Sequence, residues 1–141
     1  MAEQGRWTLP SLVEALAAAG LDVTVPDGGV HAAAVSLPGR PGLSIVAGVD
    51  GGEVQFGVLL ERVSAVPDRP DFDAALLRAN KLLTLSCFGI TDVDGEGWYA
   101  MFGQMSSASA LTEVVEEIEA LAANAEEALA MIVDWQGARG R

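Results

Sequence analysis

The residues closest to a metal-binding pattern are the acidic side chains between positions 92 and 97. Positions 1, 3 and 5 of an EF-hand calcium loop fall on Asp92, Asp94 and Glu96, and position 6 falls on Gly97. Position 12, where a bidentate Glu completes the calcium shell, falls on Gly103. Because the last ligand is missing and a strand pattern follows, we interpret this segment as an acidic, glycine-rich hairpin turn.

The single histidine and the single cysteine could act as a base or a nucleophile. His31 lies in a strand pattern before three alanines, and one histidine excludes a two-histidine metal site. Cys87 lies between Ser86 and Phe88, with no basic neighbour in sequence to stabilise a thiolate. We therefore expect a strand histidine and a buried, structural thiol.

No phosphate-binding loop is present among the glycines of residues 48–57, which match neither the dinucleotide pattern nor the P-loop. One cysteine also excludes an intramolecular disulfide. The sequence therefore assigns no catalytic, cofactor-binding or metal-ligating residue, and we expect a non-enzymatic protein without a cofactor.

The charge of the chain is strongly negative, with twenty Asp and Glu against eight Lys and Arg and a net charge of -12. No basic residue occurs from Leu82 to Ala138. Nucleic acids and anionic membranes are bound through clustered Lys and Arg, so we expect neither to be a partner. A basic protein partner is compatible with the acidity, as is a purely solubilising role.

The length of 141 residues predicts one domain over residues 1–141, with a core from about 7 to 135 and short flexible ends. The N-terminus does not have the basic and apolar regions of a secretory signal. No run reaches the roughly 18 apolar residues that span a bilayer. We expect a cytoplasmic protein without direct membrane insertion.

Hydrophobic periodicity predicts the order helix, three or four strands, helix, two strands, helix. The first helix follows Thr8 and ends at Gly20, and strands are expected at 21–25, 30–37, 43–49 and 54–63. A second helix is expected from Asp68 through Leu83, followed by strands at 86–91 and 98–104. This order predicts an α+β fold in which helices pack on an antiparallel sheet.

The last helix has the clearest pattern, opening near residues 106–109 and fraying after Trp135. Apolar residues recur at i, i+3, i+4 and i+7, which predicts one face packed on the sheet. The opposite face or flanks are expected to carry four glutamates: Glu117, Glu119, Glu126 and Glu127.

The strand at 98–104 is apolar on both faces and is the candidate partner surface. Trp98, Ala100 and Phe102 alternate with Tyr99 and Met101. One of the two faces should therefore need a cover, which would be a helix of this chain, a second copy of the chain or another protein.

Three segments, at residues 81–90, 98–106 and 116–124, resemble the bacterial YjfI-like family of unknown function. The resemblance implies a type III secretion chaperone-like or YbjN-like fold, in which helices pack on an antiparallel sheet and dimers are common. It also suggests an association with phage-shock or membrane-stress components. The matching positions are mainly apolar, Gly and Ser, so they imply no functional residue.

The leading hypothesis is a non-enzymatic protein-interaction module, adaptor-like or chaperone-like, with a protein partner or a homodimer. The alternative is a small-molecule-binding protein, or an enzyme whose site assembles only in three dimensions.

Overall fold

Six antiparallel strands form one sheet in the computed structural model, which describes residues 6–26, 32–40, 42–83 and 85–139. The order across the sheet is β1-β2-β3-β4-β6-β5, so β1 and β5 are the edge strands. The strands are β1 Asp22–Thr24, β2 Ala32–Ser36, β3 Ile45–Asp50, β4 Glu53–Arg62, β5 Cys87–Val93 and β6 Glu96–Ser106. The predicted antiparallel sheet is confirmed.

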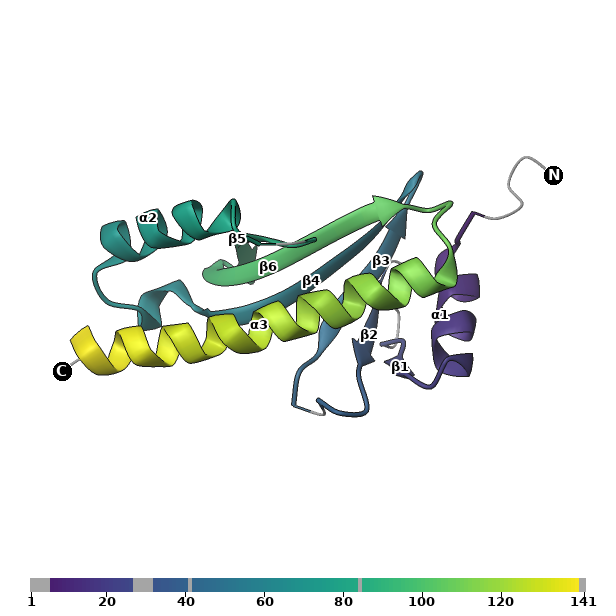
Figure 1. Ribbon diagram of the computed structural model, residues 1–141, viewed down its shortest axis with the longest axis horizontal. Coiled ribbons are helices and arrows are strands. Elements are labelled where there is room, and N and C mark those ends of the chain that lie inside the picture. The colour runs from purple at the N-terminus through teal and green to yellow at the C-terminus, as the bar shows by residue number, and fades with distance from the viewer. Residues whose placement is uncertain (1–5, 27–31, 41, 84, 140–141) are drawn as a thin grey trace.

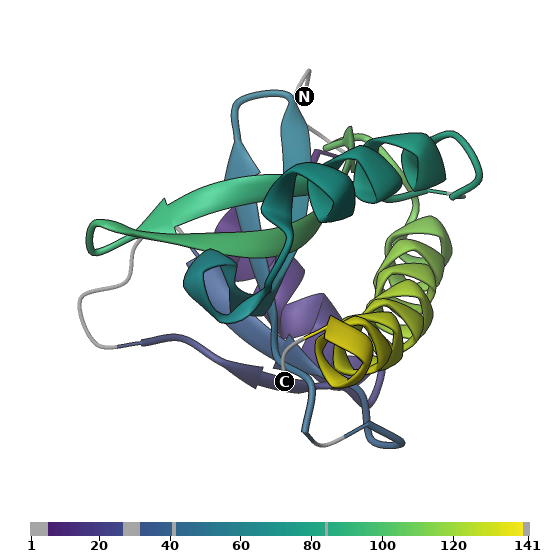
Figure 2. The same ribbon diagram turned by 90° about the vertical axis from the view of Figure 1, so that its left-hand side faces the viewer.

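Among the described residues there are three α-helices, α1 Leu9–Ala18, α2 Arg69–Asn80 and α3 Leu111–Arg139, and a 3-10 turn at Val63–Ala65. In Figure 1, α3 runs along the whole length of the molecule, with α1 near its start and α2 near its end. Figure 2 shows the tip of the β5–β6 hairpin pointing away from α3. The predicted element order and the α+β class are therefore confirmed.

Helix α1 begins where the sequence predicts, because its first residues form a capping box. The Ser11 backbone N–H donates to the Thr8 hydroxyl at 3.2 Å, and the Thr8 N–H donates to the Ser11 hydroxyl at 3.0 Å. Gly20 adopts a φ of 99° after the last turn, a left-handed value that suits glycine. Leu12 and Leu16 on this helix are buried.

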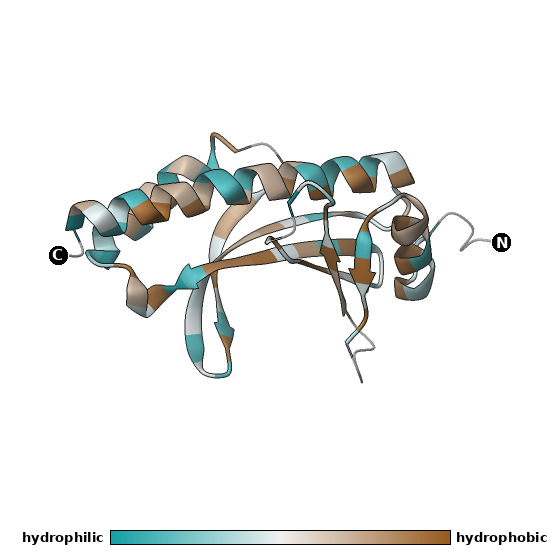
Figure 3. Ribbon diagram, turned by 90° about the horizontal axis from the view of Figure 1, so that it is seen from below, coloured by the Kyte–Doolittle hydropathy of each residue, from teal (hydrophilic) through white to brown (hydrophobic). Residues whose placement is uncertain are grey.

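The core lies between α3 and one face of the sheet. Apolar and hydrophilic positions alternate along α3, as the hydropathy colours of Figure 3 show. The buried apolar residues of α3 are Val114, Ile118, Leu121, Ala122, Ala125, Ala128 and Ile132. Side chains of β4 such as Phe56 and Val58 are buried in the same hydrophobic cluster. In the part of the chain that the structure describes, no helix is long and apolar enough to cross a membrane.

Helix α2 ends at Asn80, three residues earlier than predicted. The Asn80 side chain accepts a hydrogen bond from the Phe88 N–H at 2.6 Å and donates one to the Phe88 carbonyl at 3.4 Å. The prediction that Leu82 and Leu83 belong to the helix was therefore wrong, since the side chain of the last helical residue, Asn80, bridges to β5.

Helix α3 continues to Arg139, whereas the sequence predicted fraying after Trp135. The Trp135 indole N–H donates to the Pro67 carbonyl at 2.8 Å, and the Gln136 side chain donates to the Ala65 carbonyl at 3.0 Å. The Arg139 guanidinium lies 3.6 Å from the centre of a Trp135 ring. These contacts with the segment before α2 hold the last helical turn.

Phe72 joins three elements that are distant in sequence. Its ring is fully buried and makes edge contacts with Tyr99 of β6 at 5.0 Å and with Trp135 of α3 at 5.1 Å between centroids. Helix α2 buries only Phe72 and Leu76, so most of its attachment to the sheet depends on this aromatic cluster.

Replacing Phe72 with Ala should lower the free energy of unfolding by about 3 to 5 kcal/mol, because it removes a buried ring and leaves a cavity. Urea denaturation followed by circular dichroism measures this loss. Leu77→Ala on the same helix is the control, since Leu77 is 72% exposed and should change stability by less than about 0.5 kcal/mol. Equal losses in the two variants would contradict this role of Phe72.

Candidate functional site

The acidic segment around residue 94 is a two-residue hairpin turn, as the sequence predicts. Val93 pairs with Glu96, and the two residues between them have positive φ values, 52° at Asp94 and 82° at Gly95. This is the pattern of a type I′ turn. Within the described ranges, no three His, Cys, Asp or Glu side chains are grouped so that they could hold a metal ion.

The predicted base and nucleophile do not form a site. His31 lies outside the described residues. Cys87 is exposed, so the prediction of a buried thiol was wrong. It pairs with Phe102 at the start of β5, and an edge strand has a neighbouring strand on only one side.

The candidate partner strand is mostly interior. Tyr99, Ala100 and Met101 are buried. Trp98 and Phe102 are half-buried, and contact of this strand with a partner stays a prediction. The cover that the sequence required is thus supplied partly by the chain itself, through α2 and α3.

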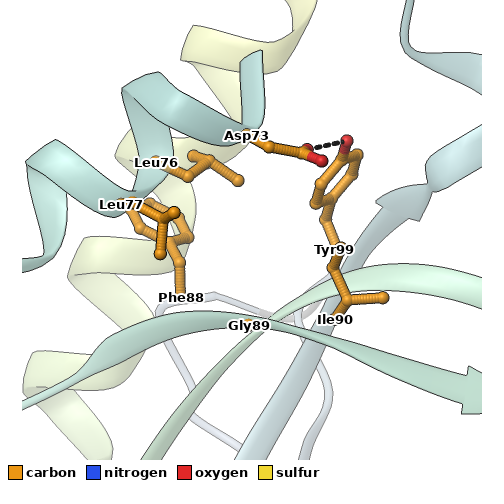
Figure 4. A pocket seen from close by; sticks show the side chains of 7 residues that line it. All are labelled: Asp73, Leu76, Leu77, Phe88, Gly89, Ile90 and Tyr99. Carbon is orange, nitrogen blue, oxygen red and sulfur yellow. Dashed lines mark hydrogen bonds between the residues drawn. The ribbon is translucent and has the colours of Figure 1, made fainter. Parts of the chain in front are cut away.

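A small cavity lies between α2 and β5, and we call it the α2–β5 cavity. Its volume is about 270 Å³, and its lining is mainly apolar. Figure 4 shows α2 side chains above the strand backbone, with Tyr99 reaching in from β6. The lining residues are Asp73, Leu76, Leu77, Phe88, Gly89, Ile90 and Tyr99.

One end of the α2–β5 cavity is polar. The Tyr99 hydroxyl donates to the Asp73 carboxylate at 2.5 Å (Figure 4). Arg69 forms an ion pair with the same carboxylate at 3.4 Å. Burial raises the pKa of Tyr99, and the hydrogen bond to Asp73 raises it further. The phenol therefore remains a protonated donor, a structural contact rather than an activated base.

Exposed apolar side chains are concentrated in the segment from α2 to the end of β5, and two of them, Leu77 and Ile90, line this cavity. Among the described residues, nine large hydrophobic side chains are exposed, and five of them fall between positions 77 and 93. They are Leu77 at 72%, Leu82 at 79%, Leu85 at 54%, Ile90 at 49% and Val93 at 38%. We call these five residues the α2–β5 apolar surface. The sequence did not reveal it, because two of the five residues, Leu77 and Leu82, were assigned to the apolar pattern of a longer second helix.

The outer edge of β5 borders this surface. Val93 and Glu96 flank a two-residue turn, so their backbone groups bond to each other, and the backbone of every second residue of β5 points towards β6. Phe88, Ile90 and Asp92 then direct their N–H and C=O groups outward. The Asn80 side chain forms hydrogen bonds with the outward backbone groups of Phe88. Beyond Phe88, the outer edge of β5 continues through Ile90 to Asp92.

A second cavity, of about 480 Å³, lies where β6 extends beyond β5, and we call it the β6-end cavity. Glu117 of α3 lines it, together with Leu85, Ser86, Cys87, Phe102, Gly103 and Gln104. Glu117 is only 5% exposed, so the prediction of a solvent-facing side chain was wrong for this residue, although Glu119, Glu126 and Glu127 are exposed as predicted. Gly103 permits the burial of Glu117, because a Cβ at position 103 would collide with the Glu117 carboxylate.

The fold is the class shared by YbjN and type III secretion chaperones. A crystal structure of YbjN, a putative transcription regulator from E. coli, matches with a TM-score of 0.66 and 17% identity over 95% of this chain and 94% of YbjN. The ExsC–ExsE complex matches with a TM-score of 0.58 and 13% identity, covering 86% of this chain and 90% of the matched chain. The HopA1–SchA chaperone-effector complex gives 0.55 and 14%, covering 89% and 90%.

Within this fold class, the chain belongs to the DUF2170 family, described as an uncharacterized protein conserved in bacteria, which matches residues 6–136. The uncharacterized protein YjfI of Escherichia coli strain K12 is 38% identical over 63 residues. YjfI of Escherichia coli O157:H7 matches equally. The match covers 45% of this chain and 47% of either relative, so it spans about half of their length. The resemblance inferred from the sequence is confirmed.

Replacing Glu117 with Gln should raise the thermal midpoint at pH 7 and change it little at pH 4. Burial raises the pKa of the Glu117 carboxyl, so the folded state binds the proton more tightly than the unfolded chain. The cost of burial is therefore present above the raised pKa and vanishes below the unfolded value of about 4.3.

Differential scanning fluorimetry between pH 4 and pH 7 measures this dependence. Glu116→Gln is the matched control, because Glu116 is exposed one position earlier on the same helix. A stabilisation by Glu117→Gln that does not grow with pH would contradict the assignment of a buried, ionising carboxyl.

Proposed function

We propose that this protein is a non-enzymatic protein-interaction module, adaptor-like or chaperone-like, that holds a protein partner on its α2–β5 apolar surface. The observation that carries the proposal is the concentration of exposed apolar side chains on α2, on β5 and on the loop between them. Single exposed leucines are common on soluble proteins, but several exposed apolar side chains in one segment, two of them lining a cavity, are typical of an interaction site.

The shape of the surface supports a protein as the ligand. The α2–β5 cavity has a volume of about 270 Å³, which is below the roughly 300 to 1,000 Å³ usual for small-molecule sites. An apolar side chain of a partner fits this size, and Leu77 and Ile90 at the rim would exclude water around it. For the α2–β5 cavity, a metabolite is therefore the less well supported ligand.

Charge around the surface favours a partner with basic residues. Asp92 lies near the end of β5, Asp94 lies in the hairpin turn, and Glu96 begins β6. Their carboxylates, with the net charge of -12, would attract such a partner and orient it. Arg78 and Lys81 lie at the other end of the surface, near the end of α2, so the surface is charged oppositely at its two ends.

A homodimer is the second candidate, and the position of β5 favours it. Edge strands pair readily with a strand of another chain, and Ile90 and Asp92 present backbone groups outward. Antiparallel pairing of two β5 strands around Ile90 would bring the basic end of α2 near the acidic hairpin of the other copy. The same surface would then bind a second copy of the chain.

The fold neighbours agree with this class of function. Two of them were solved as complexes, ExsC with ExsE and SchA with HopA1. We extend the comparison to a cytoplasmic protein-binding role for this chain, and the association with membrane-stress components remains part of the hypothesis. The identities of 13% and 14% establish only the fold.

Leu77→Glu should weaken partner binding by about tenfold or more, because it places a charge on the apolar surface at the rim of the α2–β5 cavity. A benzophenone amino acid at position 90, activated by light in cells that express the native sequence or Leu77→Glu, traps the bound protein for mass spectrometry. Val133→Glu is the matched control, since Val133 is 64% exposed but lies on α3.

Light scattering of the purified chain distinguishes the two candidates. A dimer that Leu77→Glu dissociates and Val133→Glu does not would identify a second copy as the partner. A monomer with a crosslinked protein that is lost only in Leu77→Glu would identify a different protein. A monomer without a specific crosslink would contradict the proposed function.

A further inference from the structure

Glu117 is the one charged side chain that is buried among the described residues. No hydrogen bond or ion pair connects it to another residue in the described ranges, although ionised carboxylates in protein interiors are normally paired. None of its oxygens is both enclosed and unbonded, so the carboxylate retains access to the β6-end cavity. A buried acid that faces a cavity is suited to bind a donor that enters from outside.

A second hydrogen-bond acceptor, the carbonyl oxygen of Leu85, lies close to the same part of β6 as the Glu117 carboxylate. The Leu85 carbonyl oxygen lies 3.0 Å from the position that a Cβ of Gly103 would take, and that position also abuts the Glu117 carboxylate. Leu85 has a φ of 67°, a left-handed conformation that is unfavourable for leucine. The backbone is therefore held in a strained conformation that brings a carbonyl oxygen towards a carboxylate.

The β6-end cavity also lies beside an unextended sheet edge. The register of β5 with β6 ends at the pair Cys87 and Phe102, whereas β6 continues to Ser106. The alternation of backbone groups along β6 directs those of Gln104 to the side that β5 no longer covers. An extended chain placed there could bond to Gln104 while one of its side chains enters the cavity.

We propose that the β6-end cavity is a binding site for a cationic nitrogen group, an ammonium or a guanidinium, held by the Glu117 carboxylate and the Leu85 carbonyl. Both groups only accept hydrogen bonds, and an ammonium only donates them. An anion would be repelled by Glu117. A neutral apolar group would leave the carboxylate buried without a partner.

The site is adjacent to the α2–β5 apolar surface through Leu85, which belongs to both. A Lys or Arg of a protein held on that surface is therefore one source of the cation, and this part of the inference rests on the proposed function. A free primary amine is the other source, and the cavity itself does not depend on which of the two binds.

Cys87 lines the cavity and is the only cysteine of the chain, so it offers a natural attachment point. Its thiolate attacks the disulfide of cystamine, a new S–S bond joins Cys87 to one cysteamine, and the second cysteamine leaves as a thiol. The same exchange with 2-hydroxyethyl disulfide attaches a neutral group of similar length. Mass spectrometry of the full chain at fixed thiol and disulfide concentrations gives the two equilibrium constants.

The native chain should favour the cationic adduct over the neutral one by about tenfold, the factor expected for one hydrogen-bonded charge pair. Glu117→Gln should remove most of this preference. Glu116→Gln removes the same charge from an exposed position and should keep it. Leu77→Glu should keep it as well, so the cation site can hold even if the proposed function fails.

A preference that Glu117→Gln and Glu116→Gln reduce equally would overturn the proposal, because the net charge of the chain would then explain it. The absence of any preference would do the same. Circular dichroism of each variant confirms the fold, and the thermal midpoint of the cysteamine adduct is the second measurement. It should exceed that of the neutral adduct in the native chain but not in Glu117→Gln.

The source of the cation is decided by an NMR titration with n-butylamine and with lysine blocked at both ends as acetyl and methylamide. Tighter binding of the blocked lysine, with a shift of the Gln104 amide, supports a protein side chain whose backbone adds to β6. Equal binding of the two supports a free amine. If neither compound shifts the NMR signals of Glu117, the result would count against the site.

Discussion

The contact of Phe72 with Tyr99 and Trp135 is the interaction on which the functional end of this molecule depends. Helix α2 is short and buries few side chains, so its position over β5 follows from where this ring is held. The same cluster orients Tyr99, which places its hydroxyl against Asp73 at the end of the α2–β5 cavity. Loss of the aromatic packing would therefore remove the cavity and the apolar surface together.

Glycine at two positions of the β5–β6 hairpin determines which side chains can pack against the backbone of the sheet. Gly89 leaves room for the Phe102 ring, since a Cβ there would lie 2.5 Å from a ring carbon. Gly103 leaves room for the Glu117 carboxylate on the α3 side. The absence of two methyl groups thus permits a ring to lie over the backbone and an acid to enter the interior. Neither arrangement can be predicted from the hydrophobic pattern, because that pattern does not indicate which side chain fills the space beside a glycine.

The comparisons and the geometry support the same class of protein at different levels of detail. Membership of the DUF2170 family and the shared fold with YbjN and the secretion chaperones establish the architecture. The proposed function rests instead on particular side chains, since one fold can host many functions. An apolar surface beside an acid-lined cavity would recognise a protein segment with an apolar anchor and a basic residue close together.

The sequence by itself determined the α+β class, the element order, the capped start of α1 and the hairpin turn at Asp94. These features follow from local periodicity and turn chemistry, which act over a few residues. Only the tertiary structure decided that Cys87 is exposed, that Tyr99 and Met101 are interior and that Glu117 is buried. Those outcomes depend on which strand lies at the edge of the sheet and on where a glycine leaves space opposite a helix. They are set by contacts between residues far apart in the chain, and no local pattern encodes them.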